Sequence, residues 1–460
     1  MAHYVERLWR PVEGSSGLSR RDRAPGRYQA YVPDELGADL PDLGAEAREA
    51  AETALQTLSR ADERIGRRGR FLSHLLIRSE SISSSWIEGN RVTPKKLAIA
   101  EALQHGPQVA LDVIANVRAT EQAIEVLADR GREITLEDIE DLQHVIEPRL
   151  GHGIRQEQNW VGGPGWSPLR AEFVPPPEGD VRRLVEDLAR FVTATGGSPI
   201  VRAAIAHAQF ETIHPFVDGN GRTGRALIHT VLSRTDALRN VLIPISTVFA
   251  GDTGSYIAGL TAYREIPSRL DDWVIGFSTA VERAAENAVR LSEQVEQLDV
   301  AIIDRFIQHR ADEGIKPAKP RSDALVLKLL THLAEEPVLT AAQVTQRWSA
   351  SPAAAHRALT ELADAGILAR TKDHKGKLVC FTADQHLGLV ALTERSNRAG
   401  GVDTAIRKPR FGPAAPAQDR GRLLDELTRQ VDEDGLYDVD AETYRDDLDK
   451  ARRQGMSSEH

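Results

Sequence analysis

The sequence predicts a mainly α-helical protein: a helical core with a β-hairpin flap, followed by a winged helix-turn-helix domain. Three observations predict this class. Apolar residues recur at helical spacing through residues 44–130 and through most of residues 181–308. Between these regions, residues 159–178 are rich in Gly and Pro with short aromatic and β-branched runs, which suits a hairpin or an exposed flap. After residue 320, three short helical patterns precede an alternating segment.

The N-terminal part of the chain is expected to be an arm followed by helices. Residues 1–40 are rich in Gly, Pro and Arg, which favours a loose N-terminal arm. Residues 41–130 form an N-terminal helical region, with helical spacing over residues 46–65, 71–82 and 109–129. Thr135 begins a further helix, because Asp138 three positions later resembles a capping box.

Residues 131–310 are expected to form the core domain. Its helices are predicted at residues 135–147, 181–193, 199–213, 221–233 and within 253–308. The composition K-P-A-K-P-R at residues 316–321 predicts a linker after the core.

Residues 320–385 carry the pattern of a winged helix-turn-helix. Three short helices are expected, at residues 324–335, 340–348 and 351–365. The following segment alternates apolar and polar residues around Lys375-Gly376, as a β-hairpin does. Three helices and a hairpin are typical of this domain. Residues 400–460 are expected to be a linker and an acidic, partly helical tail, to which we assign no function.

Composition limits the class of protein. The 460 residues allow two or three domains, and 41% hydrophobic with 27% charged residues is typical of soluble proteins. A net charge of −10 argues against non-specific binding to nucleic acid or to anionic membranes. The single Cys380 rules out an intramolecular disulfide and fits a reducing compartment. Without a secretion signal or a membrane-spanning stretch, we expect a cytoplasmic protein.

The segment H-P-F-V-D-G-N-G-R-T-G-R at residues 214–225 carries the chemistry. Glycines at 219 and 221 allow a backbone turn that aims N–H groups at one point, and the helix beginning nearby adds further free N–H groups. Arg222 and Arg225 lie three positions apart, so they emerge on one helix face and suit a di- or triphosphate. Asp218 could hold the accompanying Mg²⁺, and His214 could take a proton from an attacking hydroxyl. Each feature alone is more common as a turn or a packing residue, but their conjunction within twelve residues favours a nucleotide site.

This segment resembles the signature H-x-F-x-[D/E]-G-N-G-R-x-x-R of Fic-domain proteins, and the match is complete. The resemblance extends over roughly residues 25–300, including a flap at residues 158–177. It implies transfer of AMP from ATP to a Ser, Thr or Tyr hydroxyl of a target protein docked on that flap. His214 would be the base and Asp218 the Mg²⁺ ligand. The nucleotide would be held by Gly219, Asn220, Gly221, Arg222, Thr223, Gly224 and Arg225, with Tyr256 beside the base.

The stretch S-S-S-W-I-E-G-N at residues 83–90 resembles the inhibitory motif [S/T]-x-x-x-E-[G/N] of the same family. Its position before the core resembles the class with an N-terminal inhibitory helix. In that class the glutamate, here Glu88, pairs with the second arginine, here Arg225, and blocks the γ-phosphate position. Ser84, one turn earlier, can fasten the helix end by a hydrogen bond. For Glu88 alone, a surface glutamate would be the commoner interpretation.

Several alternatives stay open at this point. The group transferred could be UMP or GMP, or the site could remove AMP. The chain could instead be a nucleotide-sensing, DNA-binding regulator, although an intact His214 and Asp218 argue against pure sensing. A toxin-like activity on an essential target is a third possibility. For the winged helix, DNA binding and protein docking are about equally favoured, and the family resemblance implies a homodimer.

Overall fold

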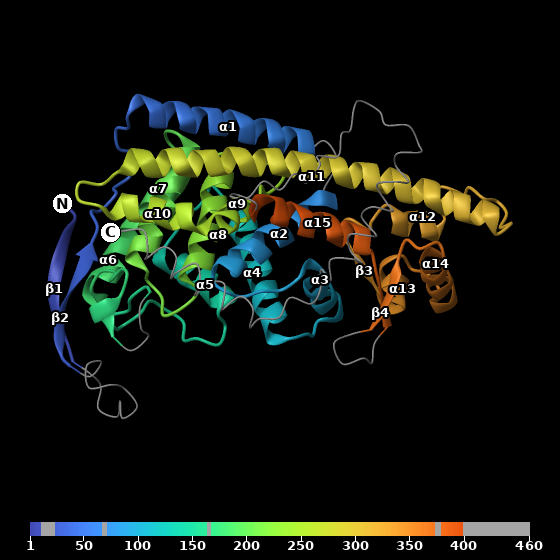
Figure 1. The fold of residues 1–460 in the computed structure, drawn as a ribbon, viewed down its shortest axis with the longest axis horizontal. Coiled ribbons are helices and arrows are strands. Elements are labelled where there is room, and N and C mark those ends of the chain that lie inside the picture. Colours follow the sequence, from blue (N-terminus) through green and yellow to red (C-terminus); the bar gives the residue numbers. More distant parts are fainter. Residues whose placement is uncertain (11–23, 67–70, 163–166, 373–378, 399–460) are drawn as a thin grey trace, which may run out of the picture. The chain divides into compact units, whose positions relative to one another are not determined.

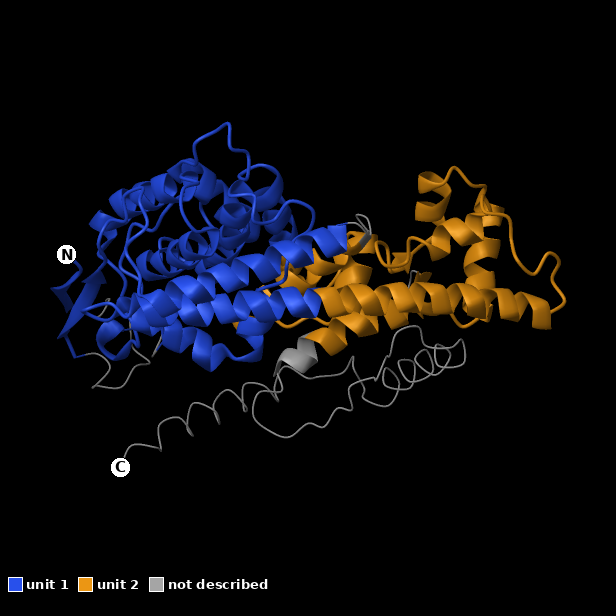
Figure 2. Ribbon diagram, turned by 90° about the horizontal axis from the view of Figure 1, so that it is seen from above, with its two compact units in different colours: residues 1–70, 115–288 blue, residues 71–114, 289–460 orange. Residues whose placement is uncertain are grey.

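A computed structural model describes residues 1–10, 24–66, 71–162, 167–372 and 379–398 (Figure 1). The expected tail at residues 400–460 and the turn around Lys375-Gly376 lie outside the described residues. The chain divides into two compact units, shown in Figure 2. Unit 1 contains residues 1–70 and 115–288, and unit 2 contains residues 71–114 and 289–460. The predicted mainly helical class is confirmed for the described part of the chain.

Unit 1 is built from helices around the paired helices α7 (Pro199–Ile213) and α8 (Asn220–Arg234). The other helical elements are α1 (Ala45–Gly66), α5 (Leu136–Ile146), η1 (Pro168–Arg170), α6 (Glu178–Thr193), α9 (Ser246–Gly251) and α10 (Thr253–Arg264). Two helices, α4 (Gln108–Glu125) and α11 (Leu270–Asp312), contain residues of both units.

The described parts of the first forty residues, 1–10 and 24–40, contain a strand pair where the sequence predicted a loose arm. β1 (His3–Trp9) pairs antiparallel with β2 (Gly26–Val32) (Figure 1). His3 lies opposite Val32, and Trp9 lies opposite Gly26. β1 alternates in burial from Tyr4 to Trp9, as two-residue strand periodicity requires, and β2 alternates over its first four residues before three buried ones, Ala30–Val32. Composition averaged over forty residues concealed these two short alternating runs.

Helix α7 is buried on all sides, which explains why its sequence is apolar around the whole helix. Gly224 of α8 allows α8 to approach it closely. A Cβ at this position would lie 2.8 Å from Oε1 of Glu211 and 2.9 Å from Cδ1 of Phe210, both on α7. The capping box predicted for α5 is also present, because the Thr135 hydroxyl and the Asp138 carboxylate each bind the other's backbone N–H.

Unit 2 combines helices with a small antiparallel sheet. Its elements are α2 (Phe71–Ile87), α3 (Pro94–Leu103), α12 (Leu325–Leu330), β3 (Val338–Leu339), α13 (Ala341–Arg347), α14 (Pro352–Asp364), β4 (Ala369–Lys372), β5 (Val379–Thr382) and α15 (Asp384–Arg398). The strand order is β3-β5-β4. The helix expected over 324–335 ends at Leu330, and β3 and α15 were not predicted.

Residues 71–114 pack within unit 2. Arg78 of α2 donates to Glu101 of α3 (2.7 Å) and to the carbonyl of Glu335 (3.0 Å). Ala98 of α3 belongs to a buried apolar cluster with Val338, Cys380 and Leu387. No helix of the described residues is long and apolar enough to cross a membrane.

Candidate active site

The loop between α7 and α8 contains the predicted site residues at its two ends. His214 follows the last residue of α7 in a left-handed conformation (φ 48°, ψ 60°), and its N–H still donates to the carbonyl of Phe210. Gly219 precedes α8 in the same region of backbone space (φ 81°). Left-handed backbone at both ends reverses the chain within a few residues, so the C-terminus of α7 and the N-terminus of α8 are brought together.

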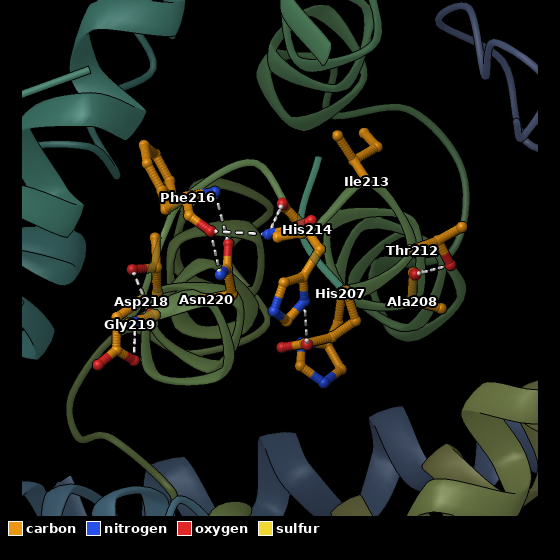
Figure 3. A network of polar contacts seen from close by, with 12 residues as sticks. His207, Ala208, Thr212, Ile213, His214, Phe216, Asp218, Gly219 and Asn220 are labelled. Atoms are coloured by element: carbon orange, nitrogen blue, oxygen red, sulfur yellow. Dashed lines mark hydrogen bonds and ion pairs between the residues drawn. The ribbon is translucent and has the colours of Figure 1, made fainter. Parts of the chain in front are cut away.

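Side chains of the loop bind its own backbone. Asn220 accepts from the Phe216 N–H (2.9 Å) and donates to the Phe216 carbonyl (2.8 Å), which closes the turn (Figure 3). Asp218 accepts from the Gly219 N–H through Oδ1 (2.6 Å). The Asn220 side chain therefore stabilises the loop. Any contact of Asn220 with a phosphate would be made by its backbone N–H.

The first turn of α8 is suited to an anion. Among the described residues no side chain caps α8, so its first N–H groups remain available as donors. Arg222, in this turn, is 2% exposed and pairs with Oε1 of Glu147 (2.6 Å) through Nη2. Its Nε and Nη1 are buried and have no hydrogen-bond partner within the described structure. Buried donors without acceptors are costly, and phosphate oxygens would satisfy them.

Asp218 is the acidic residue of the loop, and its side chain is open to solvent. Its side chain is 69% exposed, and Arg222 lies 3.8 Å from Oδ1. No group of three or more His, Cys, Asp or Glu residues that could hold a metal occurs in the described ranges. A single carboxylate beside an anion cradle fits Mg²⁺, which takes most of its ligands from phosphates and water. The residues present therefore fit a Mg²⁺ ion that is carried by a nucleotide.

The imidazole of His214 is held neutral. Its side chain is 20% exposed, and burial lowers its pKa to about 3, with Arg264 and Arg155 lowering it further. Nδ1 lies 3.9 Å from Oε2 of Glu211, beyond hydrogen-bond distance, and the tautomer with a proton on Nδ1 would leave the lone pair on Nε2. A neutral ring with a free Nε2 can accept a proton at neutral pH.

The remaining predicted residues of unit 1 are buried. Thr223 and Gly224 belong to the buried face of α8, where Thr223 donates to the Gly219 carbonyl (2.9 Å). Arg225 is 1% exposed. Tyr256 of α10 is 7% exposed, and its hydroxyl lies 2.8 Å from Nε2 of His207. The Tyr256 hydroxyl is thus bonded to a structural histidine of α7.

The two residues of the inhibitory motif belong to unit 2. Ser84 is buried in α2, and Glu88 lies in the turn directly after that helix. Gly89 follows with φ 86°, which a residue with a Cβ rarely adopts.

Sequence reasoning missed several residues that support the loop and the first turn of α8. Arg155 and Asn159 bind backbone carbonyls of the loop, and Glu147 pairs with Arg222. The antiparallel bridge between Val161 and Phe173 follows this segment. Nothing in the residue pattern around Arg155 distinguishes it from other arginines of the chain.

Comparison with known proteins supports the family. The Fic/DOC family model matches residues 133–232, and the Fic/DOC family N-terminal model matches residues 45–125. The chain therefore carries a Fic domain, and the predicted identification as a Fic-domain protein is confirmed.

Relatives named "Protein adenylyltransferase Fic" share part of the sequence. The protein from Drosophila ananassae is 27% identical over 243 residues, which are 50% of this chain and 44% of the relative. The protein from Drosophila virilis is 38% identical over 109 residues, 22% of this chain and 21% of the relative. This chain thus spans less than half the length of these relatives. A solved Fic family protein from Desulfovibrio desulfuricans is 18% identical, with a TM-score of 0.43, over 75% of this chain and 97% of that chain.

Proposed function

We propose that the protein is an adenylyltransferase that moves AMP from ATP to a Ser, Thr or Tyr hydroxyl of a target protein. The observation that carries the proposal is the loop between α7 and α8. It combines a neutral His214, an exposed Asp218 and the uncapped first turn of α8, where Arg222 has unpartnered buried donors. Relatives that match half of this chain are named for this activity.

In the proposed reaction, Nε2 of His214 removes the proton of the target hydroxyl. The hydroxyl oxygen attacks the α-phosphorus of ATP and forms the new P–O bond, while the bond from that phosphorus to the bridging oxygen breaks. Pyrophosphate leaves with the negative charge, and the proton stays on His214 until solvent removes it. The N–H groups of Gly221 and Arg222 at the start of α8 stabilise the charge that develops on the phosphoryl oxygens.

Asp218 would hold Mg²⁺, which neutralises phosphate charge when it is bound. Arg222 and Arg225 would bind the β- and γ-phosphates, with Thr223 and Gly224 beside them and Tyr256 near the base. Residues 158–177 would form the flap that docks the target segment by pairing with its backbone.

The proposed regulation is a brake within the chain. Glu88, fastened by Ser84, would bind Arg225 and exclude the γ-phosphate, because a carboxylate and a phosphate compete for one guanidinium. We further propose a homodimer in the cytoplasm.

Residues 325–382 would be a winged helix. Their helices and strands follow the order helix, strand, helix, helix, strand, strand, with sheet order β3-β5-β4. Its partner would be a protein or duplex DNA. Its described basic side chains favour protein docking, because Arg370 pairs with Asp364 and Arg347 with Glu335, both at 3.1 Å.

The test uses ATP labelled at the α-phosphate, with Mg²⁺ and three full-length proteins: wild type, Glu88→Gly, and Glu88→Gly with His214→Ala. We expect label on the protein itself or on lysate proteins, strongest for Glu88→Gly. Loss of the general base should lower labelling by about 10²–10⁴-fold.

Each other outcome removes part of the proposal. Equal labelling of wild type and Glu88→Gly would contradict inhibition by Glu88 but would still support the transferase activity. Undiminished labelling with His214→Ala removes His214 as the base. If ATP gives no label in any sample while labelled UTP or GTP does, the group transferred is wrong.

A further inference from the structure

The guanidinium of Arg155 is buried and binds four backbone carbonyls. Nε donates to the carbonyl of His214 (3.0 Å) and Nη1 to that of Glu157 (2.9 Å). Nη2 donates to the carbonyls of Pro176 (2.6 Å) and Ile213 (3.4 Å). The residue is 3% exposed, and burial lowers its pKa to about 10, so the group stays charged at neutral pH.

These carbonyls come from two separate parts of unit 1. Ile213 and His214 end α7, whereas Glu157 and Pro176 lie on the two sides of the segment that contains the Val161–Phe173 bridge. We call residues 157–161 and 173–176 the flap stem. Because a guanidinium is planar and its donors are fixed relative to one another, Arg155 sets the position of the end of α7 against both sides of the flap stem.

The end of α7 needs such a partner. The last carbonyls of a helix lack intrahelical donors and carry the negative end of the helix dipole, so a buried cation is favourable there. His214 is also left-handed (φ 48°), a conformation disfavoured for residues with a Cβ, which persists when the surroundings hold it. The His214 carbonyl accepts from Arg155 and from Nδ2 of Asn159 (3.1 Å), which also donates to the Phe216 carbonyl (3.0 Å).

We propose that Arg155 is a positioning residue that holds His214 in its left-handed conformation and joins the catalytic loop to the flap stem. Docking of a target on the flap would then be coupled to the orientation of the imidazole through the Arg155 guanidinium, with Asn159 of the flap stem as a second link to the same carbonyl. The inference rests on the proposed role of His214 as the base. Arg155 acts through His214 and the flap stem and does not touch the substrate.

The test compares Arg155→Ala and Arg155→Lys with Arg202→Ala in the full chain. Arg202 is a matched control at the other end of α7. It is 2% exposed and likewise donates to backbone carbonyls, those of Phe191 (2.9 Å), Gly196 (2.6 Å) and Ala38 (3.2 Å). Both replacements to Ala remove a buried guanidinium from carbonyl partners, but only one changes the surroundings of His214.

The first readout is independent of activity. In protein with ¹³C-labelled histidine, the ring resonance of His214 is assigned by its loss in His214→Ala. We expect this resonance to shift in Arg155→Lys and Arg155→Ala and to keep its position in Arg202→Ala. An unchanged His214 resonance in both Arg155 variants would overturn the proposal, and Arg155→Lys decides the matter if Arg155→Ala does not fold.

The second readout is labelling from α-labelled ATP in the Glu88→Gly background. Misplacement of a reacting group by about 1 Å costs about 100-fold in rate, so Arg155→Ala should lose about that factor. Guanidinium chloride, added well below denaturing concentrations, should restore part of the rate for Arg155→Ala and none for Arg202→Ala. Equal losses for the two variants without selective rescue would assign Arg155 to general stability. If no protein is labelled, adenylyl transfer fails, and the His214 resonance still decides the role of Arg155.

Discussion

The protonation of buried His207 ties the stability of this protein to pH. Its ring is fully buried in α7, stacks on Phe249 and lies 2.8 Å from the Tyr256 hydroxyl. Burial lowers its pKa to about 3, and the charge of Arg225 lowers it further. The folded protein therefore keeps this ring neutral, whereas the unfolded chain protonates it below about pH 6.5. Between pH 6.5 and pH 3 the unfolded state binds more protons, so stability falls as pH falls through this window.

We expect His207→Gln to flatten this dependence while keeping a hydrogen-bonding partner for Tyr256. One such histidine contributes at most about 1.4 kcal/mol per pH unit to the free energy of unfolding. Urea unfolding at pH 5.0, 6.0 and 7.0 measures the slope for wild type, His207→Gln and the exposed control His3→Gln. His214, whose pKa is also lowered to about 3, contributes with the same sign. Identical slopes for wild type and His207→Gln would show that burial does not keep His207 neutral.

At the scale of elements, the contact between α7 and α8 depends on Gly224. A Cβ there would meet Glu211 and Phe210 within 3.0 Å and lie 3.2 Å from Nδ1 of His207. Gly224→Ala must therefore displace the side chains of Glu211 and Phe210 or move apart the two helices whose ends form the site. We expect a loss of about 1–3 kcal/mol in the free energy of unfolding, as for other overpacked cores.

Gly276 of α11 is the matched control, because a Cβ there would meet nothing within 4 Å. Gly276→Ala should leave stability unchanged or raise it by up to about 1 kcal/mol, since alanine favours a helix. Thermal unfolding of both variants makes the comparison. If Gly224→Ala were as stable as wild type, the close approach of α7 and α8 would not depend on the missing side chain.

The elements and the site differ in how far the sequence could predict them. Long periodic segments were placed well, and α7 was predicted with its observed bounds, because apolar spacing over several turns is a strong signal. The two-residue strand β3 is too short to show a period, and β1 and β2 were concealed by the composition around them. His214 and Asp218 lie in one contiguous motif. Arg155 is one of 58 lysines and arginines, and its partners are backbone carbonyls, which carry no sequence signal.

At the scale of the whole molecule, charge decides which partners are attracted. The net charge of −10 opposes a polyanion, so DNA binding would need a local basic surface. In residues 325–372, some of the described basic side chains form ion pairs with acidic side chains of the same protein. Arg370 pairs with Asp364 and Arg347 with Glu335, both at 3.1 Å. Counterion release from DNA requires cations that are not already paired.

We therefore expect the wild-type protein not to bind a random 30-base-pair duplex at 0.15 M salt, measured by fluorescence anisotropy at micromolar protein. Asp364→Asn removes the partner of Arg370 and should strengthen binding at low salt, with a steeper dependence on salt concentration. Asp180→Asn, which removes an exposed partner of Arg183 in unit 1, makes the same charge change away from residues 325–382. Saturable, sequence-dependent binding of the wild type at 0.15 M salt would contradict the prediction and assign these residues to DNA recognition. If only Asp364→Asn gains affinity for the duplex, the surface around Arg370 can contact phosphates once its ion pair is removed. In the wild type the ion pair then prevents this contact, as expected of a module that docks proteins.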